Sequence, residues 1–157
     1  MKNVLVVFGK GGHETQAKRF LRLSNEENFD LNYIFVTDSD SFIKMNDKTF
    51  QAKEVRSKNE SKYLSFILST INNFFKACRL VHSLNTKGMI SFGPGLVVPY
   101  ALVCKVFGKK VVHIETWSRF TSKSLTGRIM YLLSDEFYIQ NLELMELYPR
   151  AIYAGRL

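Results

Sequence analysis

The sequence predicts a single α/β domain with a mostly parallel sheet. Short apolar runs rich in Val and Ile alternate along the whole chain with segments of helical periodicity, which is the pattern of repeated strand–helix–strand units. The chain has 157 residues, the size of one domain. Because no internal repeat, low-complexity run or linker divides it, we expect one domain over residues 1–157.

The first elements surround a glycine-rich turn. Val4–Phe8 is a continuous apolar run typical of a buried strand, and it ends at the loop Gly9–Gly12. His13–Leu23 then has apolar residues at helical spacing, and Leu31–Val36 reads as the second strand. The cluster Thr37–Asp40 indicates a turn that could also cap a short helix.

The middle of the chain holds the strongest helix signal. Residues 41–59 are polar and weakly patterned, with one short strand expected at Phe50–Val55. Glu60–Leu84 has apolar residues at three- and four-residue intervals, which predicts a long amphipathic helix. An aromatic group on this helix is expected in the core, with contact to a membrane interface as the alternative: Phe66, Phe74 and Phe75.

The second half repeats the strand–turn–helix pattern. Gly88–Phe92 is a strand followed by the turn Gly93–Gly95, and a helix over Leu96–Phe107 should stop at Gly108. The remaining elements are a strand at Val111–Ile114, a helix capped by Ser124 or Thr126 that runs to Leu133, a strand at Glu136–Ile139 and a short helix at Leu142–Leu147.

The charge favours an anionic partner. There are 22 basic and 14 acidic residues, a formal net charge of +8, which suits a nucleic acid, a phosphorylated ligand or an anionic membrane surface. A local basic excess lies between Lys105 and Arg128, where Glu115 is the only acid. Cys78 and Cys104 lie in apolar stretches without metal-ligand spacing, which predicts reduced thiols. We expect no secretory signal and no membrane-spanning segment.

Three loops of unusual composition follow predicted strands, where ligands bind in doubly wound sheets. Gly9–His13 would direct backbone N–H groups and a helix N-terminus at a phosphate. It departs from the dinucleotide fingerprint at Glu14, although Asp38 could contact a ribose. A turn that only joins strand to helix is the alternative for this loop. The other two loops are Gly93–Gly95 and Glu115–Arg119.

Two titratable side chains in these loops are candidates for chemistry. His13 lies at the predicted helix N-terminus, where the dipole lowers the pKa of the imidazole and favours its neutral form. It could act as a base, or simply face solvent. Glu115 ends a hydrophobic strand, and it is either a ligand contact or a carboxylate paired with Arg119 or a nearby lysine.

Taken together, these loops resemble the Alg14-like family, which contains the membrane-anchor subunit of the eukaryotic two-part N-acetylglucosaminyltransferase and bacterial capsule and exopolysaccharide relatives of the PssD or CpsF type. The residues that carry the resemblance span the chain in order: Gly9–Thr15, Gly93–Gly95 with Val98–Pro99, Val111–Arg119, Ser124–Gly127, Gln140, Tyr148–Pro149 and Gly155–Leu157. Lys10 replaces the serine that the family generally has. The N-terminal anchor of eukaryotic members is also missing, so we expect attachment to the membrane to be peripheral or through a partner.

The resemblance implies the N-terminal, acceptor-binding half of a GT-B glycosyltransferase, a Rossmann-like domain similar to the first half of MurG. It implies a heterodimer with a separate donor-binding subunit of the Alg13, PssE or CpsG type, which would hold a UDP-sugar, and an acceptor saccharide linked to a polyprenyl diphosphate. It further implies no cofactor of this chain, no metal, no nucleic acid, and a place at the cytoplasmic face of the membrane.

The resemblance also assigns roles to individual residues. It makes His13 the candidate general base toward the acceptor hydroxyl and Glu115 the alternative. The candidates for the acceptor diphosphate are Lys10, Gly11, Gly12, Gly93, Gly95 and Arg119. Two other readings stay open: a small dinucleotide-binding oxidoreductase module that uses Gly9–Gly12 and Asp38, and a recruitment subunit without catalytic residues.

Overall fold

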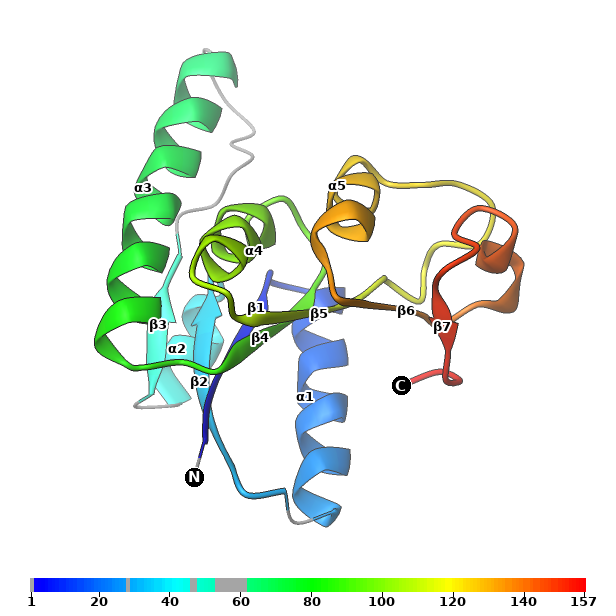
Figure 1. Ribbon diagram of the computed structural model, residues 1–157, viewed down its shortest axis with the longest axis horizontal. Coiled ribbons are helices and arrows are strands. Elements are labelled where there is room, and N and C mark those ends of the chain that lie inside the picture. The colour runs from blue at the N-terminus through cyan, green and yellow to red at the C-terminus, as the bar shows by residue number, and fades with distance from the viewer. Residues whose placement is uncertain (1, 28, 46–47, 53–61) are drawn as a thin grey trace.

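A seven-stranded parallel sheet forms the centre of the computed structural model, which describes residues 2–27, 29–45, 48–52 and 62–157 (Figure 1). Every neighbouring pair of strands is parallel, in the order β3-β2-β1-β4-β5-β6-β7. The mostly parallel α/β prediction is therefore confirmed. The strands are β1 (Lys2–Phe8), β2 (Leu31–Thr37), β3 (Thr49–Gln51), β4 (Gly88–Phe92), β5 (Lys110–Ile114), β6 (Glu136–Ile139) and β7 (Ile152–Tyr153).

Helices cover both faces of the sheet because its strands are apolar on both sides. On one face, Val6 and Phe8 of β1 pack with α1 (Gly12–Glu26) and α2 (Asp40–Met45). On the other face, Leu5 and Val7 pack against a layer of three helices (Figure 1): α3 (Lys62–Ser83), α4 (Val97–Val106) and α5 (Leu125–Leu133). A short 3-10 helix, η1 (Leu142–Met145), joins β6 to β7.

The order of the strands reverses between β1 and β4. These two strands pair in parallel, with Val4 opposite Gly88 and Phe8 opposite Phe92, although the chain leaves β1 toward β2 and leaves β4 toward β5. The connections that follow the two strands therefore run in opposite directions along the sheet. Such a reversal is where doubly wound sheets bind ligands.

Most predicted elements are present, with local differences. Ser124 rather than Thr126 caps α5, since its Oγ accepts from Gly127 N at 2.7 Å, and Gly108 ends α4 with a φ of 64°. The strand expected at Phe50–Val55 occurs at Thr49–Gln51, and residues 53–55 lie outside the described residues. The helix expected at Leu142–Leu147 is only the 3-10 turn, and β7 was not predicted.

The expectation that the aromatic group of α3 lies in the core is wrong for the two residues whose side chains are described. Phe74 is 39% and Phe75 68% exposed, and the side chain of Phe66 lies outside the description. The buried stripe of α3 instead contains Ala77, Leu80 and Val81, which belong to the same core cluster as the buried residues of α4.

Neither cysteine is in a disulfide, in keeping with the prediction of reduced thiols. No helix in the described part of the chain combines the length and apolar character that a bilayer crossing requires.

Candidate functional site

The three predicted loops lie at the carboxyl edge of the sheet, after β1, β4 and β5. The first two touch each other at the strand reversal. Gly9 lies against Pro94, so that a Cβ added to Gly9 would be 2.4 Å from Pro94 Cγ. The glycine at position 9 is therefore needed for the close approach of the two loops.

The glycine loop opens helix α1. Gly11 is its N-cap and has a φ of 78°, a conformation that favours glycine. Gly11 and Gly12 are exposed, and a Cβ added at either position would meet no heavy atom within 4 Å, so their backbone is open to a ligand. The first N–H groups of a helix lack intrahelical partners, which suits an anion at this point.

His13 lies at the junction of the two glycine loops. Its ring takes the space beside Gly93, because a Cβ on Gly93 would be 1.9 Å from His13 Nδ1. The Nδ1 atom is buried and has no hydrogen-bond partner. Burial lowers the pKa of His13. The direction matches the expectation from the helix dipole, but burial is the cause. The residue as a whole is half-buried, with Nδ1 on its enclosed side.

A neutral His13 can accept a proton through an unprotonated ring nitrogen. Because Nδ1 is enclosed, the ring is held by packing rather than by a carboxylate partner. This geometry allows His13 to serve as a base toward a hydroxyl bound above the glycine loops.

Glu115 is a buried carboxylate beneath the first turn of α5. Its Oε1 accepts from Thr116 N at 3.0 Å, and its Oε2 accepts from Ser124 Oγ at 3.5 Å. Burial raises the pKa of Glu115, while the Thr116 amide and the charge of Arg119 act in the opposite direction. Among the described residues it forms no ion pair with Arg119, whose Nη1 donates to Ser122 Oγ instead.

Gly127 makes room for this carboxylate. A Cβ at position 127 would be 2.0 Å from Glu115 Oε2 and 2.6 Å from the Tyr148 hydroxyl oxygen. The sequence motif Ser124–Gly127 therefore encloses Glu115 as well as capping α5. His13 and Glu115 have separate contacts, His13 at Gly93 and Glu115 under α5, so the structure does not join them into one hydrogen-bonded pair.

A buried amide network connects α1 to the loop after β5. Gln16 Nε2 donates to Thr116 Oγ1 at 3.2 Å, and Gln140 Nε2 donates to Gln16 Oε1 at 2.7 Å and to the Glu115 carbonyl at 2.8 Å. These side chains are almost fully buried. The network fixes the third loop relative to the first, and Gln16 was not among the predicted site residues.

His113 was also missed as a separate site residue. It is fully buried on β5, and its Nδ1 lies 2.8 Å from Ser91 Oγ on β4. Burial, and to a smaller degree the nearby His13, lowers the pKa of His113 to about 3. A polar residue at the same position on two adjacent, otherwise apolar strands is the sequence signal that could have identified this pair.

Asp38, the candidate ribose ligand of the dinucleotide alternative, and Glu14, which departs from its fingerprint, both have partners within the protein. Asp38 Oδ1 accepts from Lys10 N at 2.7 Å, so this carboxylate supports the glycine loop. Glu14 accepts from Ser39 Oγ at 2.6 Å and pairs with Lys18 at 2.6 Å. Neither arrangement resembles a cradle for a dinucleotide.

The basic excess between Lys105 and Arg128 is not one patch. Lys105 and Lys110 lie near the amino end of β5, where they pair with Asp135 and Glu136, each at 2.5 Å. Arg119 and Arg128 follow the carboxyl end of the same strand. The basic excess of the sequence is therefore divided between the two ends of β5. In the described part of the chain no three His, Cys, Asp or Glu side chains gather as a metal site requires.

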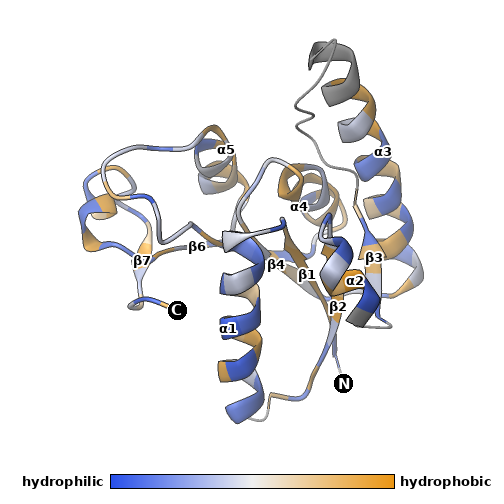
Figure 2. Cartoon of the chain, turned by 180° about the vertical axis from the view of Figure 1, so that it is seen from behind, coloured by the Kyte–Doolittle hydropathy of each residue, from blue (hydrophilic) through white to orange (hydrophobic). Residues whose placement is uncertain are grey.

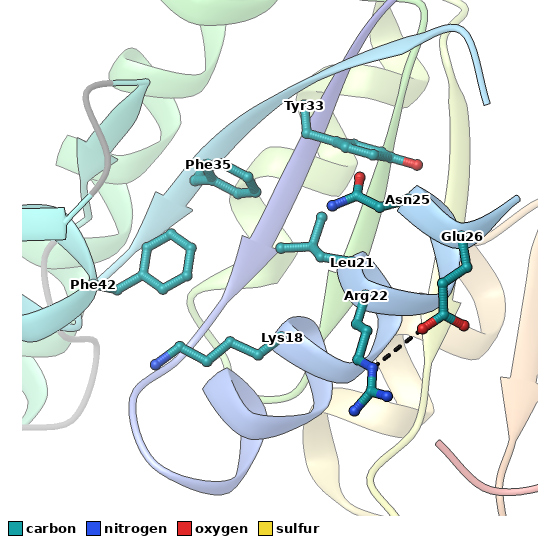
Figure 3. A pocket seen from close by; sticks show the side chains of 8 residues that line it. All are labelled: Lys18, Leu21, Arg22, Asn25, Glu26, Tyr33, Phe35 and Phe42. Atoms are coloured by element: carbon teal, nitrogen blue, oxygen red, sulfur yellow. Dashed lines mark hydrogen bonds and ion pairs between the residues drawn. The ribbon is translucent and has the colours of Figure 1, made fainter. Parts of the chain in front are cut away.

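A shallow groove of about 700 Å³ lies apart from this site, between α1, β2 and α2 (Figure 3). Its apolar wall contains Leu21, Tyr33 and Phe35, and Figure 3 shows the ion pair of Arg22 and Glu26, 3.2 Å apart, at its rim. It contains none of the predicted site residues.

Comparison with known proteins matches nearly the whole chain. A family model described as "Oligosaccharide biosynthesis protein Alg14 like" matches residues 4–157. The human UDP-N-acetylglucosamine transferase subunit ALG14 is 28% identical over 178 aligned residues, which cover 99% of this chain and 82% of that protein.

Two solved structures share the fold. MurG of Acinetobacter baumannii has a TM-score of 0.68 at 17% identity over 89% of this chain, and a UDP-N-acetylglucosamine 2-epimerase of Rickettsia bellii has a TM-score of 0.70 at 14% identity over 99%. The matched regions are 41% and 45% of those two chains. The fold is thus that of one half of GT-B glycosyltransferases and related epimerases.

Proposed function

Since the chain belongs to the Alg14-like family of oligosaccharide biosynthesis proteins, we propose that it is the acceptor-binding subunit of a two-component glycosyltransferase. The enzyme transfers a sugar from a UDP-sugar to a saccharide linked to a polyprenyl diphosphate. The first donor to test is UDP-N-acetylglucosamine, because the human relative is named for that sugar nucleotide.

The contact of His13 with Gly93 carries this proposal. At this contact, the glycine loop, the positive end of α1 and a neutral imidazole lie together at the strand reversal. In the reaction, an acceptor hydroxyl attacks C1 of the donor sugar from the side opposite UDP, the bond from C1 to the UDP oxygen breaks, and His13 takes the hydroxyl proton. This is an inverting transfer, and UDP leaves with the bonding electron pair.

The acceptor diphosphate binds at the start of α1 in this proposal. The exposed backbone of Gly11 and Gly12 supplies N–H donors. From the second loop, Gly95 adds its backbone to the same site, and Gly93 leaves the space that the His13 ring occupies. Lys10 and Arg119 add positive charge from the first and third loops. Glu115 is the alternative base, although burial raises its pKa and it lies under α5.

The donor sugar nucleotide binds to a separate catalytic subunit. Relatives named as transferase subunits support this assignment, as does the match to only 41% of the MurG chain. We place the complex at the cytoplasmic face of a membrane, with peripheral attachment of this chain, in the synthesis of capsular or extracellular polysaccharide.

Reconstitution tests this proposal. Transfer from UDP-N-acetylglucosamine to a polyprenyl-diphosphate-linked saccharide is measured with this chain, with the donor-binding subunit, and with both together. Only the two subunits together should transfer the sugar. His13→Ala should abolish most of the activity of the pair, whereas His82→Ala, at an exposed histidine on α3, should not.

Each contrary outcome has a definite meaning. Full turnover by this chain alone would exclude a split enzyme. Suppose that complexes carrying His13→Ala or Glu115→Ala kept wild-type activity, while omission of this subunit abolished activity. The chain would then be a recruitment subunit without a catalytic residue.

A further inference from the structure

A long stretch that includes α3, β4, α4 and β5 contains no acidic residue. Residues 61–114 hold no Asp or Glu but seven Lys or Arg: Lys62, Lys76, Arg79, Lys87, Lys105, Lys109 and Lys110. The formal net charge of the whole chain is +8, so nearly all of the excess comes from this third of the sequence. The helices of this stretch form one layer on the sheet (Figure 1).

The outer side of α3 is apolar and open to solvent. Five large side chains at helical spacing form a row that we call the outer stripe of α3: Ile67, Leu68, Ile71, Phe74 and Phe75, exposed by 46%, 60%, 47%, 39% and 68%. Apolar residues recur along α3 in Figure 2. The opposite side, with Ala77 and Leu80, is buried, so α3 has one apolar face in the core and a second without cover among the described residues.

The outer stripe begins on the half of α3 nearer the candidate site, with Ile67, Leu68 and Ile71, and continues past the midpoint of the helix to Phe74 and Phe75. A helix of 22 residues is about 33 Å long, whereas a strand of five residues spans about 17 Å. Because α3 leads into the amino end of β4, its first half extends past the carboxyl end of the sheet, as Figure 1 shows. That is the edge where Gly93 and His13 meet.

We propose that the outer stripe of α3 is a membrane-docking surface that inserts into the interface of a bilayer containing anionic lipid. Large aliphatic and aromatic side chains enter the region between headgroups and acyl chains, and basic residues nearby attract the anionic lipid. The exposed Arg79 lies one turn beyond Phe75 on the same helix.

The charge selects this occupant over two others. A second copy of the chain would bring two molecules of net charge +8 together, and like charges repel. A nucleic acid would match the charge but would leave Ile67, Leu68 and Ile71 without an apolar partner. An anionic bilayer matches both features. This inference deepens the proposed function, because a lipid-linked acceptor would then lie beside the carboxyl edge of the sheet.

Vesicle flotation tests the docking surface without any sugar transfer. The probes are vesicles of phosphatidylcholine alone and of phosphatidylcholine with about 30% phosphatidylglycerol, an anionic lipid. The wild-type chain should bind the anionic vesicles more tightly, and salt of about 1 M should weaken binding because it shortens the screening length to about 3 Å.

The decisive variant is Leu68→Gln with Phe75→Gln, and its matched control is Leu23→Gln with Phe29→Gln. The control residues are 49% and 60% exposed and lie outside α3. The α3 variant should lose about tenfold or more in vesicle affinity, since each side chain gives up apolar burial, while the control should stay within about twofold. Arg79→Gln should lower binding to anionic vesicles only.

Several results would overturn the proposal. One is a wild-type chain that does not bind anionic vesicles, and another is an α3 variant that binds them as tightly as wild type. A third is an α3 variant that still binds vesicles but no longer self-associates or no longer binds the donor subunit. Failure of the proposed function is separately visible. His13→Ala should remove transfer to a detergent-dispersed acceptor, whereas the α3 variant should lose transfer only when the acceptor is embedded in vesicles.

Discussion

Replacing Gly93 by alanine should displace the ring of His13. The new Cβ would lie 1.9 Å from His13 Nδ1 and 2.2 Å from two further ring atoms, far inside van der Waals contact. The backbone of Gly93 also has a φ of 84°, which an alanine adopts only with strain. The ring and the alanine cannot occupy the same space, so the ring must move.

The magnitude follows from two separate costs. An alanine at positive φ costs about 1–2 kcal/mol, and forcing extra volume into a packed site costs about 1–3 kcal/mol more. Gly108→Ala supplies the matched control, because Gly108 has a φ of 64° and nothing within 4 Å of an added Cβ. We expect Gly93→Ala to lower the free energy of unfolding by about 2–5 kcal/mol and Gly108→Ala by only about 1–2 kcal/mol.

A double-mutant cycle with His13→Ala isolates the clash. Denaturant unfolding of the two single variants and the combined variant gives the coupling between positions 13 and 93. Removal of the imidazole should reduce the cost of Gly93→Ala to that of Gly108→Ala. Transfer by the reconstituted pair should fall in Gly93→Ala to the level of His13→Ala and stay near wild type in Gly108→Ala.

The reasoning fails if the coupling is below about 0.5 kcal/mol, the usual error of additivity. It also fails if Gly93→Ala keeps the transfer rate of wild type. Either result would mean that His13 is not held against Gly93.

Three further outcomes are expected. Because burial raises the pKa of Glu115, its ionised form is disfavoured on folding. Glu115→Gln should therefore raise the free energy of unfolding at pH 7, with no gain below pH 4 in denaturant titrations. Burial lowers the pKa of His113 to about 3, so the unfolded chain binds the extra proton and stability should decrease as the pH is lowered from about 6.5 to 3, by at most about 1.4 kcal/mol per pH unit. His113→Gln should flatten this slope. Ser124→Ala removes the cap of α5 and should cost about 1 kcal/mol in thermal unfolding, while Thr126→Ala should cost less.

Different results would contradict each of these. A Glu115→Gln variant that unfolds more easily at pH 7 than at pH 4, relative to wild type, would mean that the ionised carboxylate stabilises the fold. An unchanged slope in His113→Gln would assign the acid sensitivity to other groups. Equal losses in Ser124→Ala and Thr126→Ala would exclude a specific cap.

Strands and glycine turns were predictable because their signals are local. The run Val4–Phe8 and the turn at Gly93 each depend on a few adjacent residues, and both occur where expected. The aromatic side of α3 was not predictable in this way. A helix with apolar residues on two faces gives the same periodicity whichever face is buried. Only the tertiary packing, which places Ala77, Leu80 and Val81 in the core, decides between the two faces.

The contacts between residues far apart in the chain could not be predicted from the sequence either. Helical dipole reasoning gave the direction of the pKa shift of His13, but the enclosure of Nδ1 by Gly93 joins residues 80 positions apart. The pairing of Gln16 with Gln140 joins positions 124 apart. Such partners depend on strand order, which local patterns do not specify.

The pairing of β1 with β4 has a consequence for folding in time. Val4 of β1 and its partner Gly88 of β4 are 84 positions apart in the sequence (88 − 4). Closing such a long loop is slow compared with forming a helix. Synthesis adds about 5–20 residues per second, so β1 waits for several seconds before its central partner exists. During that interval an apolar strand stays open to wrong partners, and the junction of His13 with Gly93 forms only once β4 has joined the sheet.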